Sequence, residues 1–337
     1  MLSADHLPSG TRATKVNPTM PPEEKMDVAF PALTPAQRLH LDIYGYVVVP
    51  ETLTADECGT LIEALQQLKH DLIAAGKPSP REPDPASKVR GACVADRNST
   101  HHYFMRDIEQ ADPSITAYIT HPLMVGMAAE IIGGEIRMVE SNAHINARHP
   151  DWQSQEAATH KYGFHRGIDV PYGSYTRNGL YHCNFVKTLT NLTDLGPEDG
   201  GTVVIAGSHK MDLPPAQLIE CAYQDRSLIH QVIAPAGSTL LFVEPLIHAT
   251  GLLTSDRERI ILITGYGPAH LPYWGDGELT PEFRAAIPPN QQQLFFGRQN
   301  WDRRVKERAD LMIPADPRSF ELGVWNQRDS LPTGDQA

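Results

Sequence analysis

Apolar residues in the first part of the chain recur at helical spacing, and helix-start signals come before them. Thr34, followed by Pro35, predicts the start of a helix that leads into an apolar strand at 46–50. Thr54 and Glu57 form a capping box, which predicts a second helix start. The leucines of that helix share one face: Leu61, Leu65, Leu68 and Leu72. We expect this helix to pack on a sheet.

The pattern changes from helical to alternating after an apolar segment at 124–132, which ends at Gly133 and Gly134. Short runs of apolar and polar alternation then follow, separated by Gly, Pro, Asn and Asp turns. The expected strands are 135–139, 140–146, 181–187, 201–206, 238–243 and 259–264. Helices first and many short strands afterwards predict a mainly β fold with flanking helices, a jelly-roll (double-stranded β-helix, cupin-like) core.

One predicted strand has a fully polar face. The residues on that face are Glu140, Asn142, His144 and Asn146. Such a face is either solvated or lines the inside of a barrel. The candidate metal-binding segment that follows favours the barrel interior.

Three regions are expected along the chain. Residues 1–33, rich in Pro, Ser, Thr and charge, are interpreted as a flexible tail. A single jelly-roll domain is expected at 34–270, and 271–337 is expected to be an extension, a possible lid, without a core of its own.

Composition narrows the class of protein. The formal net charge of -12 argues against a partner that is a nucleic-acid polymer or an anionic membrane. The four cysteines lack CxxC spacing and are interpreted as reduced thiols in a cytoplasmic protein. No signal peptide is visible, and no apolar run approaches the ~18 residues that a membrane span needs.

The order of two histidines and an arginine predicts a non-haem iron site. His165 follows a short polar strand, His248 follows the strand that ends at 243, and Arg259 begins the next strand. Two His and one carboxylate usually hold one face of Fe(II). We expect both imidazoles and Arg259 to face one cavity, because neighbouring strands of a jelly roll share an interior. The alternative for Arg259 is a structural salt bridge to Glu198 or Asp199.

The chain resembles the phytanoyl-CoA dioxygenase family over roughly residues 35–270. The matching segments are Gly45–Val48, His165 with the position two residues later, Asn191–Asp194, Asp199–Lys210, His248 and Arg259. The resemblance implies an Fe(II)/2-oxoglutarate oxygenase that uses O2, with His165 and His248 as iron ligands and Arg259 on the distal carboxylate of 2-oxoglutarate. It also implies 2-oxoglutarate contacts by Thr250 and by Asn142 or Asn146.

The departure from the family is Gly167, where its hydroxylases carry Asp. In one interpretation Asp169 supplies the carboxylate after a sharp turn, giving an iron-dependent hydroxylase. In another the iron chemistry is lost and the fold only binds ligands. Retention of both histidines and Arg259 argues against a fold that only binds ligands, because buried polar groups without partners are costly.

The third interpretation is a halogenase. Chloride can replace both the missing ligand and its negative charge, and Gly167 leaves room for it where Asp would clash and repel. In this respect the chain is similar to iron/2-oxoglutarate halogenases, which carry Ala or Gly at this position. That resemblance implies chlorination of an unactivated C–H by hydrogen abstraction and chlorine rebound.

The sequence does not identify the substrate. No docking patch indicates a carrier protein, so a free small molecule is favoured. A group of basic side chains precedes the barrel and is either a solvated loop or a phosphate site: Lys88, Arg90, Arg97, His101, His102 and Arg106. With Arg166 and His144 beside the metal, they would suit a nucleotide. By analogy with bacterial nucleotide halogenases, a (deoxy)adenosine nucleotide in natural-product biosynthesis is the candidate.

Overall fold

The computed structural model describes residues 33–75, 94–98, 101–150, 159–167, 173–177, 179–275 and 279–298, with the backbone alone for 94–98. The statements below concern these residues. The predicted tail up to residue 32, the basic residues Lys88 and Arg90, and the alternative carboxylate Asp169 lie outside them.

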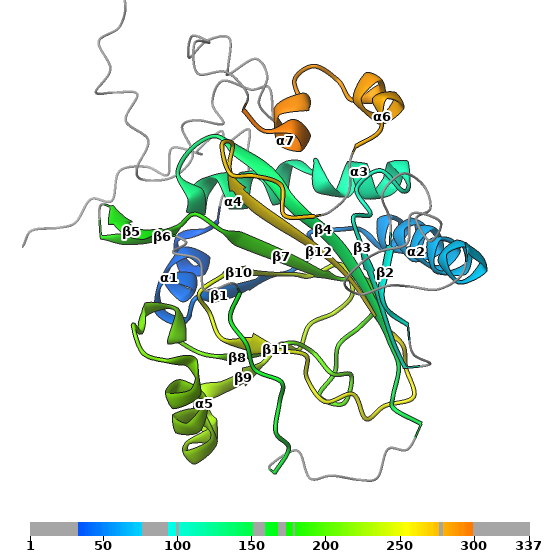
Figure 1. Cartoon of the computed structure of the whole chain (residues 1–337). Coiled ribbons are helices and arrows are strands. Elements are labelled where there is room, and N and C mark those ends of the chain that lie inside the picture. The colour runs from blue at the N-terminus through cyan, green and yellow to red at the C-terminus, as the bar shows by residue number, and fades with distance from the viewer. Residues whose placement is uncertain are drawn as a thin grey trace, which may run out of the picture.

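Two sheets face each other (Figure 1). The large sheet has the order β1-β10-β7-β12-β4-β3-β2. Its strands are β1 (Tyr46–Val49), β10 (Thr239–Val243), β7 (Val186–Asn191), β12 (Arg259–Pro268), β4 (Ile136–Asn146), β3 (His102–Arg106) and β2 (Val94–Asn98). The small sheet, β11-β8-β9, consists of β11 (His248–Ala249), β8 (Val203–Ile205) and β9 (Ile229–Gln231). This is the predicted jelly-roll core.

The long antiparallel pair of β4 and β12 sets which side chains face the small sheet. Asn142 pairs with Ile263 and His144 with Ile261, and the four line one pocket. The alternate residues Ala143 and Ile145 are buried in the main hydrophobic core instead. The polar face of β4 therefore points into the barrel, as the interior interpretation predicted.

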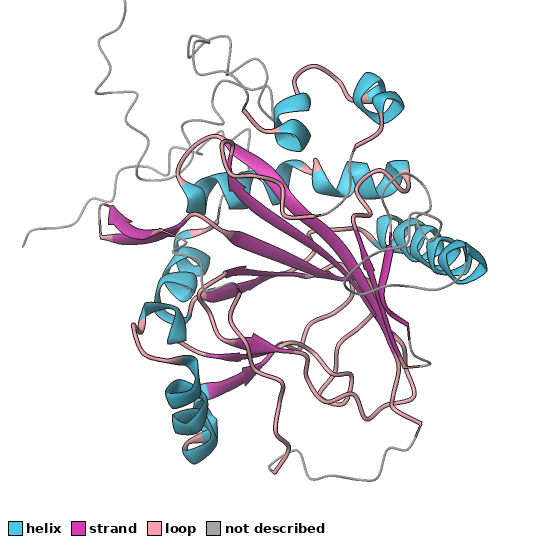
Figure 2. Ribbon diagram, viewed as in Figure 1, coloured by secondary structure: helices cyan, strands magenta, loops and turns pink. Residues whose placement is uncertain are grey.

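Helices lie along the outer face of the large sheet, and one helix, Pro215–Gln224, packs against β8 of the small sheet (Figure 2). The helices are α1 (Pro35–Tyr44), α2 (Ala55–Ala75), α3 (Pro113–Ile119), α4 (Pro122–Ile132), α5 (Pro215–Gln224), α6 (Pro281–Ala286) and α7 (Gln292–Phe296), with 3-10 turns η2 (Ser208–Lys210) and η3 (Arg226–Leu228). The α2 leucines at 61, 65, 68 and 72 are buried in the main core, as expected.

The predicted helix ends are confirmed. Thr34 and Gln37 form a capping box at α1, and Thr54 and Glu57 exchange the same bonds at α2. Gly133 ends α4 at φ 76°, in the left-handed region that favours glycine.

The expectation that no apolar run is long enough to span a membrane needs correction. Pro113–Ile132 covers 20 residues and contains an 18-residue window with a mean hydropathy of 1.3, which meets the length and composition of a span. The segment is two helices, α3 and α4, interrupted at Thr120 and His121. Buried residues of both helices belong to the main core, as in core helices of folded domains.

The predicted strands are incomplete, because β2, β3, β9 and β11 were not predicted and β12 runs four residues further than expected. Two predicted boundaries are also wrong. Segments 135–139 and 140–146 form one continuous strand, β4, and segment 181–187 is split between β6 (Leu180–Cys183) and β7. Strand β6 pairs with β5 (Ser174–Arg177) in a separate two-stranded ribbon. The split falls at Asn184 and Phe185, and the Phe185 side chain is fully buried there.

Residues beyond 270 contribute to the same core. Leu294 and Phe295 of α7 are buried in the main cluster, and Phe283 of α6 packs against it. The described part of the predicted extension is thus attached to the jelly roll through apolar contacts.

Candidate active site

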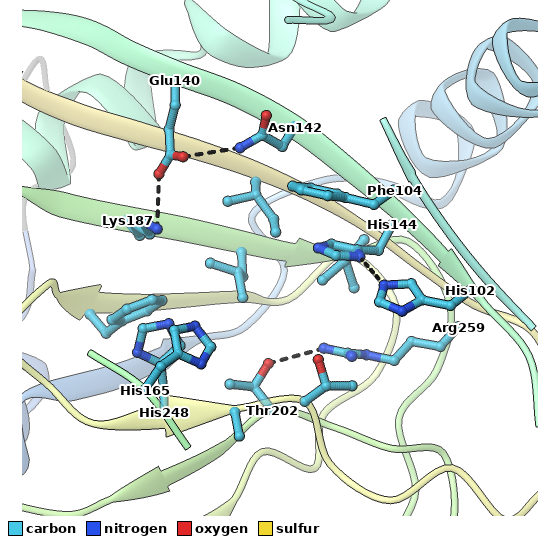
Figure 3. Close-up of a pocket in the computed structure, with 16 residues that line it drawn as sticks. His102, Phe104, Glu140, Asn142, His144, His165, Lys187, Thr202, His248 and Arg259 are labelled. Atoms are coloured by element: carbon cyan, nitrogen blue, oxygen red, sulfur yellow. Dashed lines mark hydrogen bonds and ion pairs between the residues drawn. The ribbon is translucent and has the colours of Figure 1, made fainter. Parts of the chain in front are cut away.

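A cavity of about 230 Å³ lies between the two sheets (Figure 3). Polar side chains from both sheets line it among apolar ones. They are His102, Glu140, Asn142, His144, His165, Lys187, Thr202, His248, Thr250 and Arg259. Strand alternation explains the set, because β4, β7 and β12 contribute residues two apart.

His165 and His248 are neighbours. Their backbones exchange two hydrogen bonds, His165 N to His248 O at 3.0 Å and His248 N to His165 O at 2.8 Å. Their ring centroids are 4.4 Å apart, and both rings face the pocket. The structure brings the two predicted metal ligands together.

Each imidazole is oriented by a carbonyl of its own segment. Nδ1 of His165 lies 3.1 Å from Gly163 O, and Nδ1 of His248 lies 2.8 Å from Leu246 O. A carbonyl only accepts, so each Nδ1 carries the proton. Nε2 is then the nitrogen that would bind a metal, the arrangement typical of metal-binding histidines.

The electrostatics keep His248 neutral. Burial lowers its pKa well below the usual value, and the nearby His165 and Lys187 lower it further. A neutral imidazole is the form that binds a metal.

Arg259 lies across the pocket from the histidines (Figure 3). Its Nη2 donates to the Thr202 hydroxyl at 3.0 Å, whereas Nε and Nη1 have no hydrogen-bond partner among the described residues. Burial lowers the pKa of Arg259 to about 10. The structural salt bridge is absent there, because Asp199 pairs with Arg257 instead. A buried guanidinium with unused donors fits a carboxylate ligand.

Of the other predicted 2-oxoglutarate contacts, two line the pocket and one does not. Thr250 and Asn142 line the pocket, and Asn142 donates to Glu140 at 3.0 Å. Asn146 pairs with Arg259 along the strands but does not line the pocket, and its Oδ1 has no described hydrogen-bond partner.

The space beside Gly167 is filled, which corrects the expectation of an open position. A Cβ placed on Gly167 would lie 1.7 Å from Glu244 Oε1 and 2.3 Å from its Cγ and Cδ. Glu244 is 1% exposed. The glycine therefore has a packing reason as well, because any side chain at 167 would require Glu244 to move.

Lys187 connects this carboxylate to a second one. Its Nζ lies 3.3 Å from Glu244 and 3.0 Å from Glu140. Burial raises the pKa of Glu244 to about 7, although Lys187 acts in the opposite direction. For Lys187 the two carboxylates outweigh burial and raise its pKa.

The predicted substrate residues are only partly at the site. His144 lines the pocket, stacks on Phe104 at 4.1 Å and contacts His102 at 3.0 Å. Arg166 donates to Leu213 O and is not among the residues that line the pocket. Arg90 lies outside the described residues, as does the side chain of Arg97.

Sequence reasoning missed Thr202, Lys187 and Glu244 as site residues. Thr202 lies in the predicted strand 201–206, and Lys187 ends the predicted strand 181–187. The period-two pattern of β7 could have identified Lys187, which shares a face with Leu189. Nothing local identifies Glu244. Within the described residues, no group of three or more His, Cys, Asp and Glu side chains is placed to hold a metal ion.

The fold and the site define a jelly-roll enzyme with a paired-histidine centre and a buried arginine. A family model, phytanoyl-CoA dioxygenase, matches residues 41–261. The chain belongs to this family and is an Fe(II)/2-oxoglutarate-dependent oxygenase.

Solved structures share this fold. HygX from Streptomyces hygroscopicus, with nickel and 2-oxoglutarate bound, is 20% identical with a TM-score of 0.53, covering 75% of this chain and 94% of HygX. AviO1 from Streptomyces viridochromogenes Tue57 is 15% identical with a TM-score of 0.50, covering 70% and 96%. No curated protein matches the sequence.

Proposed function

We propose that this protein is an Fe(II)/2-oxoglutarate-dependent halogenase of small molecules. Gly167, at the position of the family's third iron ligand, carries the proposal. Support comes from the described residues, which offer two imidazoles and no third side chain placed with them to hold a metal. A halide would supply the ligand that this pair of imidazoles lacks.

His165 and His248 would hold the iron, and Arg259 with Thr202 would bind the distal carboxylate of 2-oxoglutarate. When bound, Fe(II) and 2-oxoglutarate would supply the electrons that activate O2. The overall reaction is R–H + Cl⁻ + 2-oxoglutarate + O2 + H⁺ → R–Cl + succinate + CO2 + H2O. The substrate C–H bond is broken, a C–Cl bond forms, and O2 is reduced. The chain's own part is to hold the substrate carbon near the halide.

A second cavity supports a free small-molecule substrate. It measures about 290 Å³ and shares Phe104, Glu140 and Asn142 with the first. Its remaining lining combines an aromatic ring, a guanidinium and a carboxylate: Trp274, Arg106 and Asp107, with Gly275. The aromatic rings suit a planar ring, Arg106 suits an anionic group, and the two carboxylates suit hydroxyl or amino groups. A (deoxy)adenosine nucleotide in natural-product biosynthesis is therefore the first substrate we propose to test.

The test is product analysis by mass spectrometry. The protein is supplied with Fe(II), 2-oxoglutarate, O2 and saturating chloride, together with a panel of nucleosides and nucleotides. We expect a product in which hydrogen is replaced by chlorine, and by bromine when bromide replaces chloride. A product that is only hydroxylated under saturating chloride would reject the halogenase.

The second candidate is a hydroxylase, and the position of Glu244 favours it. This carboxylate occupies the side-chain space of residue 167. If it bound the iron, the centre would have two His and one carboxylate, as in ordinary oxygenases. The hydroxylated product is the outcome that would establish this candidate.

A further inference from the structure

Glu244 follows β10 and lies four residues before His248. Its amide donates to Phe185 O at 3.0 Å, which fixes its backbone beside β7. Its side chain crosses the volume that a Cβ at residue 167 would need. The group nearest to the missing ligand is thus a carboxylate from another strand.

This carboxylate shares its cation with a second carboxylate. Lys187 pairs with Glu244 at 3.3 Å and with Glu140 at 3.0 Å. One ammonium between two buried carboxylates compensates each of them only in part, so a competing anion that faces Lys187 can take the place of Glu244.

We propose that Glu244 controls halide entry: its side chain fills the space beside Gly167 that a halide needs and is displaced when a halide binds. Lys187, released from Glu244, then supplies the positive charge that faces the halide. This proposal rests on the halogenase function. It names Glu244 and Lys187 as the residues that set halide affinity.

The physical reason is competition for one volume by two anions. A carboxylate and a halide of the same charge repel at a few ångströms, and burial strengthens that repulsion. Removing the carboxylate frees both the space and the Lys187 charge. Removing Glu140 leaves the volume beside Gly167 filled, although it takes one charge from the same lysine.

The test is a chloride titration of the anaerobic Fe(II)–2-oxoglutarate protein, followed by its visible absorption. For Glu244→Ala we expect chloride to bind at least tenfold more tightly than in the unaltered protein. For the matched control Glu140→Ala we expect a change of less than threefold. Lys187→Met should weaken binding at least tenfold. Glu244→Gln keeps the volume and removes the charge, so an intermediate gain is expected.

Three results would overturn the proposal. An unchanged chloride affinity in Glu244→Ala would mean that Glu244 only packs. Equal gains in Glu244→Ala and Glu140→Ala would mean that net charge alone matters. A tenfold or greater loss of Fe(II) affinity in Glu244→Ala, measured in the same titration cell, would make Glu244 an iron ligand.

A double-mutant cycle tests the geometry without metal. Gly167→Ala places a methyl group on the Glu244 carboxylate and should lower the Tm, whereas in Glu244→Ala the same change should cost little. Equal losses of Tm in both backgrounds would contradict the contact.

Failure of this inference and failure of the proposed function remain distinguishable. Chloride binding that tightens in Glu244→Ala, without any chlorinated product from the unaltered protein, would keep the halide site and reject the halogenase. Chlorinated product together with an unchanged chloride affinity in Glu244→Ala would support the halogenase and reject the role of Glu244 in halide entry.

Discussion

A positive charge is buried at Arg259 with a single described hydrogen-bond partner, the neutral Thr202 hydroxyl. Burying such a cation is costly unless an anion joins it, and its lowered pKa is the sign of that cost. A dicarboxylate ligand removes the cost and uses the donors left over. The folded protein without ligand therefore has a buried cation, to which a carboxylate of 2-oxoglutarate should bind strongly.

Arg259→Lys should raise the Kd for 2-oxoglutarate at least 30-fold, because an ammonium cannot make the paired contacts of a guanidinium. Thr202→Val should raise it only about 3- to 10-fold, the value of roughly one hydrogen bond. The measurement is an anaerobic titration of the Fe(II) protein with 2-oxoglutarate. Arg257→Lys, whose partner Asp199 lies outside the pocket, is the control. Wild-type affinity in Arg259→Lys would place the ligand elsewhere.

Residues of the site were predictable where strand alternation alone decides their direction. His165, His248 and Arg259 follow from chain order, and the β4 polar face follows from period two. Glu244 could not be predicted in this way. It lies in the turn before Pro245, and only the tertiary approach of the Gly167 backbone gives it a role.

The helix α7 shows how a short element is fixed by packing. It has five residues and no side-chain cap, so its own hydrogen bonds cannot maintain it. Its Phe295 is 1% exposed and contacts Phe283 edge to face at 5.2 Å. Its attachment thus depends on buried aromatic area and on Arg137 of β4, whose Nη2 donates to Phe295 O at 2.9 Å.

Phe295→Ala should lower the free energy of unfolding by about 3–5 kcal/mol, the usual cost of emptying a buried aromatic site. Phe296→Ala, next in the chain but only partly buried, should cost less than half of that. Urea unfolding of the two variants checks the difference. Equal, small losses of unfolding free energy in the two variants would show that α7 contacts the core without stabilising the protein.

Elements were predictable in proportion to how local their signals are. The capping boxes of α1 and α2 and the glycine that ends α4 are each determined by a few neighbouring residues. The break between β6 and β7 is not, because Phe185 leaves the strand pattern to pack against Trp274 at 5.2 Å. That contact joins segments almost ninety residues apart.

For the molecule as a whole, buried carboxyls link stability to pH. Glu109 is fully buried, and burial first, then the nearby Asp107, raises its pKa to about 8. The unfolded chain releases this proton near pH 4.5. Between those two pH values the folded state holds a proton that the unfolded state has lost, so stability falls as pH rises.

Glu109→Gln should remove this dependence, because an amide does not titrate. The unaltered protein should lose up to about 1.4 kcal/mol per pH unit between pH 5 and 8 relative to the variant. Urea unfolding at pH 5.5 and 7.5 measures the difference. Parallel pH profiles for the two proteins would mean that Glu109 titrates normally.

The carbonyls that orient His165 and His248 bear on which metal ion the protein takes up in the cell. Because each ring is held by its own backbone, the nitrogen pair is arranged before any ion arrives. A prearranged pair of imidazoles follows the intrinsic ranking of the first-row ions, in which cobalt and nickel bind more tightly than ferrous iron. Iron loading is then expected to depend on which ions the cell supplies, and we expect growth in excess nickel to yield a correctly folded but inactive enzyme.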